Sequence, residues 1–98
     1  MNNTAAIRIS AIFGFLGVCL GAFGAHGLEK RLEELGTTGT WETAVLYHLV
    51  HAAVLLAVAF REPLAKSAWV LFSAGILIFS GTLYVLSLTG IKWLGAIT

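Results

Sequence analysis

The chain has 98 residues, of which 58% are hydrophobic and only 11% are charged, and its formal net charge is +1 at pH 7. Soluble domains carry about 25% charged residues, so this composition excludes a soluble enzyme. The small net charge excludes a nucleic-acid-binding protein, and a single cysteine excludes a disulfide-stabilised secreted module.

Three stretches of the sequence, 9–28, 43–60 and 67–91, carry no charged side chain. A helix crosses a bilayer core with about 20 apolar residues, so each stretch is long enough to span a membrane. Backbone polar groups in lipid must be satisfied within the segment, which only helices achieve here. The sequence therefore predicts an all-α polytopic membrane protein. We expect a single transmembrane domain over residues 1–98, with the bilayer of the plasma (inner) membrane as its partner.

The first span is expected at about 9–26, after a short polar leader that ends at Arg8. Small residues recur on nearly one face of this helix, and the candidates for helix packing are Gly14, Gly17, Gly21 and Gly24. Small residues let membrane helices approach closely. Three interpretations stay open: an internal contact with another helix, a seam between the first helices of a homo-oligomer, and a glycine-lined ligand slot.

A short amphipathic helix is expected at about 28–35, between the first two spans. Its leucines recur at intervals of four and three, at Leu28, Leu32 and Leu35. Charged residues fill the other faces, which is typical of a helix lying in the plane of the membrane surface. Gly36 is expected to end this helix, and residues 37–40 to form a turn in which Thr40 caps the next helix.

The second span is expected at about 42–60 and carries the most informative residues. His48 and His51 share a helical face near its middle, with Tyr47 beside them. Ionisable groups at membrane depth are costly and rarely face lipid. His26 ends the first span on the same membrane side as Trp41, which stands at the start of the second span. The three histidines are therefore expected in one half of the bilayer. They are interpreted as structural histidines, as a proton or small-ligand site, or as metal or haem ligands.

The third span is expected at about 67–91. Hydroxyl groups form a stripe along it, at Ser73, Ser80, Tyr84 and Ser87. Such a stripe indicates either hydrogen bonds between helices or the polar lining of a path for water or a small molecule. Tryptophans stand near the ends of the second and third spans, at Trp41, Trp69 and Trp93, and are expected in the interfacial belts.

Four ordered motifs carry a resemblance to a known family. They are GAFGAHGL at 21–28, WETAVLYHLVHA at 41–52, FSGTLY at 79–84 and GIKWLGAIT at 90–98. From about residue 9 to residue 98, the chain resembles the small membrane-protein family catalogued as domain of unknown function 423. The resemblance implies a helical membrane protein, typically of four spans, with no established biochemical activity. Members continue past the last motif into a fourth span, so we expect this chain to carry three spans and to lack the last.

The sequence contains no nucleophile–base pair, phosphate-binding loop or paired carboxylates within a span. We therefore expect no catalytic residue, no metal, no cofactor and no enzyme activity. The leading hypothesis is a non-enzymatic scaffold or accessory protein of the membrane. The alternatives are a small-molecule or proton carrier and a haem- or metal-binding redox subunit. The candidate intramembrane polar site comprises His26, Tyr47, His48, His51, Ser80 and Tyr84.

Overall fold

A computed structural model describes residues 2–97, and the elements of this part of the chain are all helices. Their bounds are α1 (Asn3–Ala25), α2 (Glu29–Leu35), α3 (Thr38–Ala59), α4 (Lys66–Gly75), η1 (Ile76–Ser80), α5 (Gly81–Thr89) and η2 (Lys92–Ala96). Here η1 is a π-helical turn that joins α4 to α5, and η2 is a short 3-10 helix.

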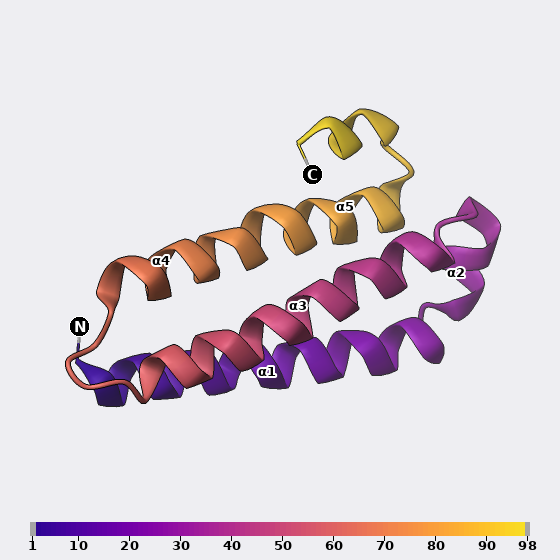
Figure 1. The fold of residues 1–98 in the computed structure, drawn as a ribbon. Coiled ribbons are helices and arrows are strands. Elements are labelled where there is room, and N and C mark those ends of the chain that lie inside the picture. Colours follow the sequence, from indigo (N-terminus) through magenta and orange to yellow (C-terminus); the bar gives the residue numbers. More distant parts are fainter. Residues whose placement is uncertain (1, 98) are drawn as a thin grey trace.

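α3 is the central helix of the fold. α1 packs along one side of it, and α4, η1 and α5 pack along another (Figure 1). Three helical stretches are apolar enough to cross a membrane: α1, α3 and the continuous run Lys66–Thr89, with 23, 22 and 24 residues. At 1.5 Å per residue these are about 33–36 Å long, enough for a bilayer core. The predicted all-α fold with three spans is confirmed.

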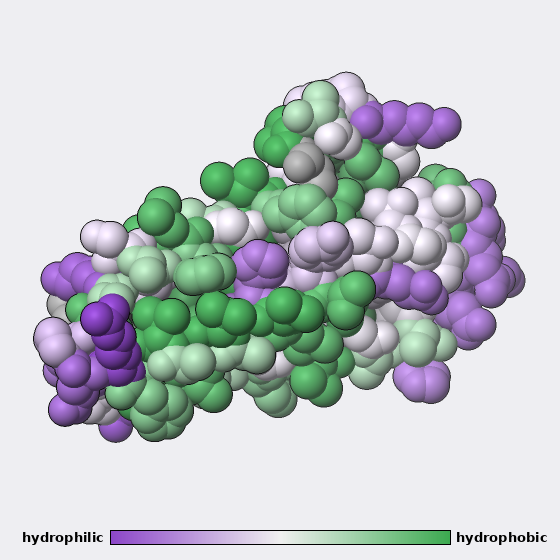
Figure 2. Space-filling model, viewed as in Figure 1, coloured by the Kyte–Doolittle hydropathy of each residue, from purple (hydrophilic) through white to green (hydrophobic). Residues whose placement is uncertain are grey.

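Apolar side chains cover most of the middle of the molecule, and hydrophilic ones gather towards its two ends (Figure 2). Several large apolar residues of the spans are strongly exposed, among them Phe15, Val18 and Leu71. A soluble protein would bury such a surface, whereas in a bilayer it contacts lipid chains.

The first span starts earlier than the sequence pattern indicated. α1 begins at Asn3, and the side chain of Asn2 accepts a hydrogen bond of 2.8 Å from the backbone N–H of Ala5. Asn3 donates from Nδ2 to the carbonyls of Ala59 (3.0 Å) and Arg61 (2.7 Å) at the end of α3. The expected polar leader is therefore wrong, because these polar side chains cap α1 and attach it to α3.

The amphipathic helix forms as expected, but the connection after it is shorter. Gly36 ends α2 with a φ of 68°, in the left-handed region that favours glycine. α3 begins directly after Thr37, so the expected turn over 37–40 and the expected cap at Thr40 are wrong. The Thr37 hydroxyl instead donates a hydrogen bond of 2.7 Å to the carbonyl of Ser87. This bond ties the start of α3 to the end of the third span.

Two of the three tryptophans, Trp41 and Trp69, are not on the surface, where the expected interfacial belt would place them. Trp41 is 2% exposed and Trp69 is 6% exposed, so both side chains lie inside the protein. Each donates a hydrogen bond from its indole N–H to α1, and these two bonds hold the rings inside the protein and away from the membrane interface. Trp93 is 67% exposed and lies in η2, beyond the end of the third span at Thr89.

Candidate functional site

One face of α1 receives the ring nitrogens of three side chains from the other two spans. The three contacts are Trp69 Nε1 to Ser10 Oγ at 3.0 Å, His48 Nε2 to the Phe13 carbonyl at 2.7 Å, and Trp41 Nε1 to the Leu20 carbonyl at 2.9 Å. Of the four buried residues of α1, three recur every seven positions, at Ser10, Gly17 and Gly24, and the fourth is Ala6. A ring N–H in hydrocarbon needs an acceptor, so each contact fixes a neighbouring helix against α1.

Gly17 and Gly24 make room for two of these rings. A Cβ atom on Gly24 would overlap the indole nitrogen of Trp41. A Cβ atom on Gly17 would lie 3.2 Å from Cδ2 of His48 and 2.6 Å from Cδ2 of Leu49. Gly17 lies about one helical turn after Phe13, whose carbonyl contacts the His48 ring. Gly24 lies about one turn after Leu20, whose carbonyl contacts the Trp41 ring. Because side chains lean towards the helix N-terminus, a larger residue there would cover that carbonyl.

The other two glycines of the predicted packing face differ from each other. Gly21 faces α3, where an added Cβ would lie 3.3 Å from Cγ1 of Val45. Gly14 has no atom within 4 Å of that position. The structure therefore brings three of the four glycines against α3, in a contact within one chain.

His48 links all three spans. It is 4% exposed, its Nδ1 lies 2.9 Å from the Tyr84 hydroxyl in α5, and its Nε2 meets the Phe13 carbonyl in α1. A carbonyl oxygen only accepts, so Nε2 carries a proton and donates to Phe13; in the tautomer whose Nδ1 is unprotonated, Tyr84 donates to Nδ1. The Tyr84 ring also packs on Trp41, with centroids 4.8 Å apart. Because both ring nitrogens are used, neutral His48 has no lone pair free for a metal or haem iron.

The serines of the third span have different partners. Ser80, 1% exposed, donates a hydrogen bond of 2.9 Å to the Ala44 carbonyl in α3. Ser73 donates to Val70 of its own helix at 2.9 Å. Ser87 Oγ is buried and finds no hydrogen-bond partner among residues 2–97. Of these three serines, only Ser80 joins two spans through its side chain within residues 2–97.

The remaining predicted site residues lie apart from His48. His51 Nδ1 donates to the Tyr47 carbonyl at 2.7 Å, and the His51 ring faces Phe72 at 6.0 Å between centroids. Tyr47 is 45% exposed and packs on Phe79. His26 is exposed at the end of α1. The three histidines have different neighbours, and in the described chain no group of three or more His, Cys, Asp or Glu could hold a metal.

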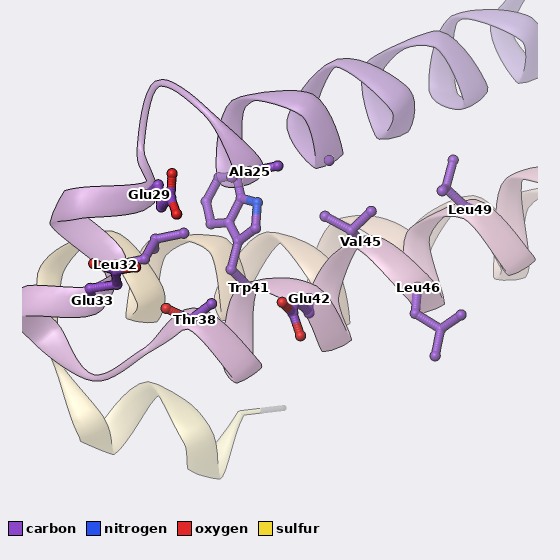
Figure 3. Close-up of a pocket in the computed structure, with 12 residues that line it drawn as sticks. Ala25, Glu29, Leu32, Glu33, Thr38, Trp41, Glu42, Val45, Leu46 and Leu49 are labelled. Carbon is purple, nitrogen blue, oxygen red and sulfur yellow. The ribbon is translucent and has the colours of Figure 1, made fainter.

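A cavity of about 520 Å³, not predicted from the sequence, lies where α1 ends and α2 and α3 begin (Figure 3). The Trp41 indole lies between α1 and α3 at this place. Three carboxylates also line the cavity, from Glu29, Glu33 and Glu42. The spacing of Glu29 and Glu33, which puts them on one helical face, is the signal from which this site could have been found.

Comparisons with known proteins agree with this architecture. Residues 20–98 match the family model described as "Protein of unknown function (DUF423)". The chain belongs to this family. The match confirms the resemblance that the four motifs carry.

Curated relatives in bacteria and in a yeast are similar over most of the chain. The UPF0382 membrane protein YwdK of Bacillus subtilis (strain 168) is 46% identical over 99 residues, covering 94% of this chain and 79% of that protein. The UPF0382 membrane protein C1782.12c of Schizosaccharomyces pombe is 39% identical over 83 residues, covering 83% of this chain and 70% of that protein. No solved structure gives a significant match. The relatives' names state a membrane location and no activity.

Proposed function

We propose that this protein is a non-enzymatic scaffold or accessory protein of the plasma (inner) membrane. The hydrogen bonding of His48 carries the proposal, because both of its ring nitrogens join α3 to the neighbouring spans. Ionisable groups at membrane depth otherwise mark ion paths or ligand sites. Here the buried histidine acts as a structural link, and the spans offer a packed apolar body to lipid and to other membrane proteins. Helical spans also suit the inner membrane, since outer-membrane proteins cross as β-barrels.

An absorption spectrum with metal analysis, on mildly solubilised protein, tests this proposal. We expect no Soret band and no stoichiometric metal, in the chain and in His48→Leu alike, because both ring nitrogens of His48 already make hydrogen bonds and no three metal-ligating groups come together in residues 2–97. A Soret band or bound metal that His48→Leu abolishes would contradict the proposal and make the protein a redox subunit.

A carrier is the second candidate function, and one observation favours it. His51 lines a cavity of about 190 Å³ with Tyr47, Phe79 and Ser80. Within the described residues only its Nδ1 makes a hydrogen bond, which leaves Nε2 for a proton or a small ligand. Proton flux into liposomes that His51→Leu abolishes would favour this candidate over the scaffold.

Self-association through α1 is part of the scaffold proposal. The face of α1 that carries Gly17, Gly21 and Gly24 packs on α3. Two copies would therefore meet through the lipid-facing side chains of α1, among which Phe15 and Val18 are strongly exposed.

A further inference from the structure

The cavity at the α2 end of the molecule has the size and form of a small-ligand site. Its volume is about 520 Å³, and binding pockets for small molecules range from about 300 to 1,000 Å³. Gly21, Gly24 and Ala25 of α1 line one side of the cavity, and the Trp41 indole, which packs directly on Gly24, lines it beside them. The apolar wall continues along α3 towards the middle of the span through Val45, Leu46 and Leu49 (Figure 3).

The mouth of this cavity is acidic. Glu29 and Glu33 of α2 and Glu42 of α3 line it, all three are exposed, and no basic side chain is among the lining residues. Arg31 of α2 donates from Nη2 to the Leu88 carbonyl in α5 at 3.2 Å. Its charge is thereby held on the third span and away from the cavity. The potential at the mouth is therefore negative, in a place that the ends of α1 and α3 put at the membrane surface.

An organic cation fits these walls better than a metal ion. In residues 2–97 no three carboxylates or other metal-ligating groups come close enough to share a metal. An ammonium group is attracted by carboxylates that are more widely spaced than metal ligands. An apolar chain attached to it can pack against the residues of α3 that line the cavity. A phospholipid with an amine head group fits less well, because the same carboxylates repel its phosphate.

We propose that this cavity binds an amphiphile with an ammonium head group, no phosphate and a single apolar chain. The head group lies near Glu29, Glu33 and Glu42, and the chain lies along the α3 wall of Val45, Leu46 and Leu49, beside Gly21. Neither His48 nor its hydrogen-bond partners Tyr84 and Phe13 line this cavity. A negative result for the binding site therefore leaves the scaffold proposal unaffected, and the reverse also holds.

Photolabelling of the chain in phosphatidylcholine nanodiscs tests the proposal. The probe is dodecylammonium with a diazirine near the chain end, and the neutral control is the matching dodecanol. Two double variants remove the same charge: Glu33→Gln/Glu42→Gln at the cavity, and Glu34→Gln/Glu62→Gln outside it. Labelled peptides are mapped by mass spectrometry, with unlabelled dodecylammonium or phosphatidylethanolamine as competitors.

We expect saturable labelling on α3 around Val45–Leu49, removed by excess dodecylammonium and not by phosphatidylethanolamine. The cavity double variant should weaken binding about tenfold, or about 1.4 kcal/mol, and the other double variant less than twofold. Equal weakening by both double variants would overturn the proposal, since it would show general attraction to negative charge. Equal saturable labelling by the dodecanol probe would contradict the proposal, because it would show that the ammonium group does not contribute to binding. Competition by phosphatidylethanolamine would also contradict it, because the ligand would then be a phospholipid.

Discussion

Gly24→Ala is expected to lower the free energy of unfolding by about 2–3 kcal/mol, through overpacking at a helix contact. The added methyl group overlaps the indole nitrogen of Trp41. The indole must then move, so it loses its 2.9 Å bond to the Leu20 carbonyl and its packing on Tyr84. Gly14→Ala is the matched control, because no atom lies within 4 Å of its added methyl. Both variants gain the same small helix propensity from alanine.

The measurement is unfolding by sodium dodecyl sulfate in mixed micelles, followed by circular dichroism. The two variants add one methyl group each to the same helix, so the difference between them reports the contact with Trp41. If both variants unfold at the same detergent fraction, the close approach of α1 and α3 at Gly24 is wrong.

His48→Leu is expected to lower the free energy of unfolding by about 2 kcal/mol, and His51→Leu by less than about 1 kcal/mol. Hydrogen bonds between membrane helices contribute about 0.6 kcal/mol on average and up to about 1.7 kcal/mol. His48→Leu removes two of them and leaves the Tyr84 hydroxyl without its partner. Within residues 2–97 the His51 ring makes one hydrogen bond, to Tyr47 in its own helix, and Lys66→Ala, at an exposed helix start, serves as the control.

A double-mutant cycle with Tyr84→Phe separates this hydrogen bond from general packing. The coupling between His48→Leu and Tyr84→Phe is expected at about 0.5–1.5 kcal/mol, because each removes one partner of the same bond. Strictly additive effects would contradict the link between α3 and α5.

The three spans could be predicted from the sequence because their cause is local. An uncharged run of sufficient length has one stable form in lipid, and the positions of Glu29, Lys66 and other charges mark where such runs stop. The helix ends depend on single hydrogen bonds and were predicted less well. Asn2 and Thr37 look alike as polar residues before a helix, yet one caps α1 and the other bonds to Ser87 in α5.

The candidate site could be predicted only in part, for a related reason. The seven-residue interval of Ser10, Gly17 and Gly24 is visible in the sequence, and it marks the packed face of α1. The rings that meet this face come from 59, 35 and 21 residues away in the chain. No local pattern tells which of His48 and His51 points to that face, so their shared spacing wrongly suggested a shared environment.

Nitrogen-15 NMR of the histidine side chains tests the central claim that these histidines are held by structural hydrogen bonds. His48 donates from Nε2 to Phe13 and His51 donates from Nδ1 to Tyr47, so the two rings should hold opposite tautomers. Spectra of histidine-labelled protein at mildly alkaline pH, assigned with His26→Gln and His51→Gln, should show one fixed tautomer for each ring. A mixture of tautomers at His48, or a metal-bound nitrogen there, would contradict the claim.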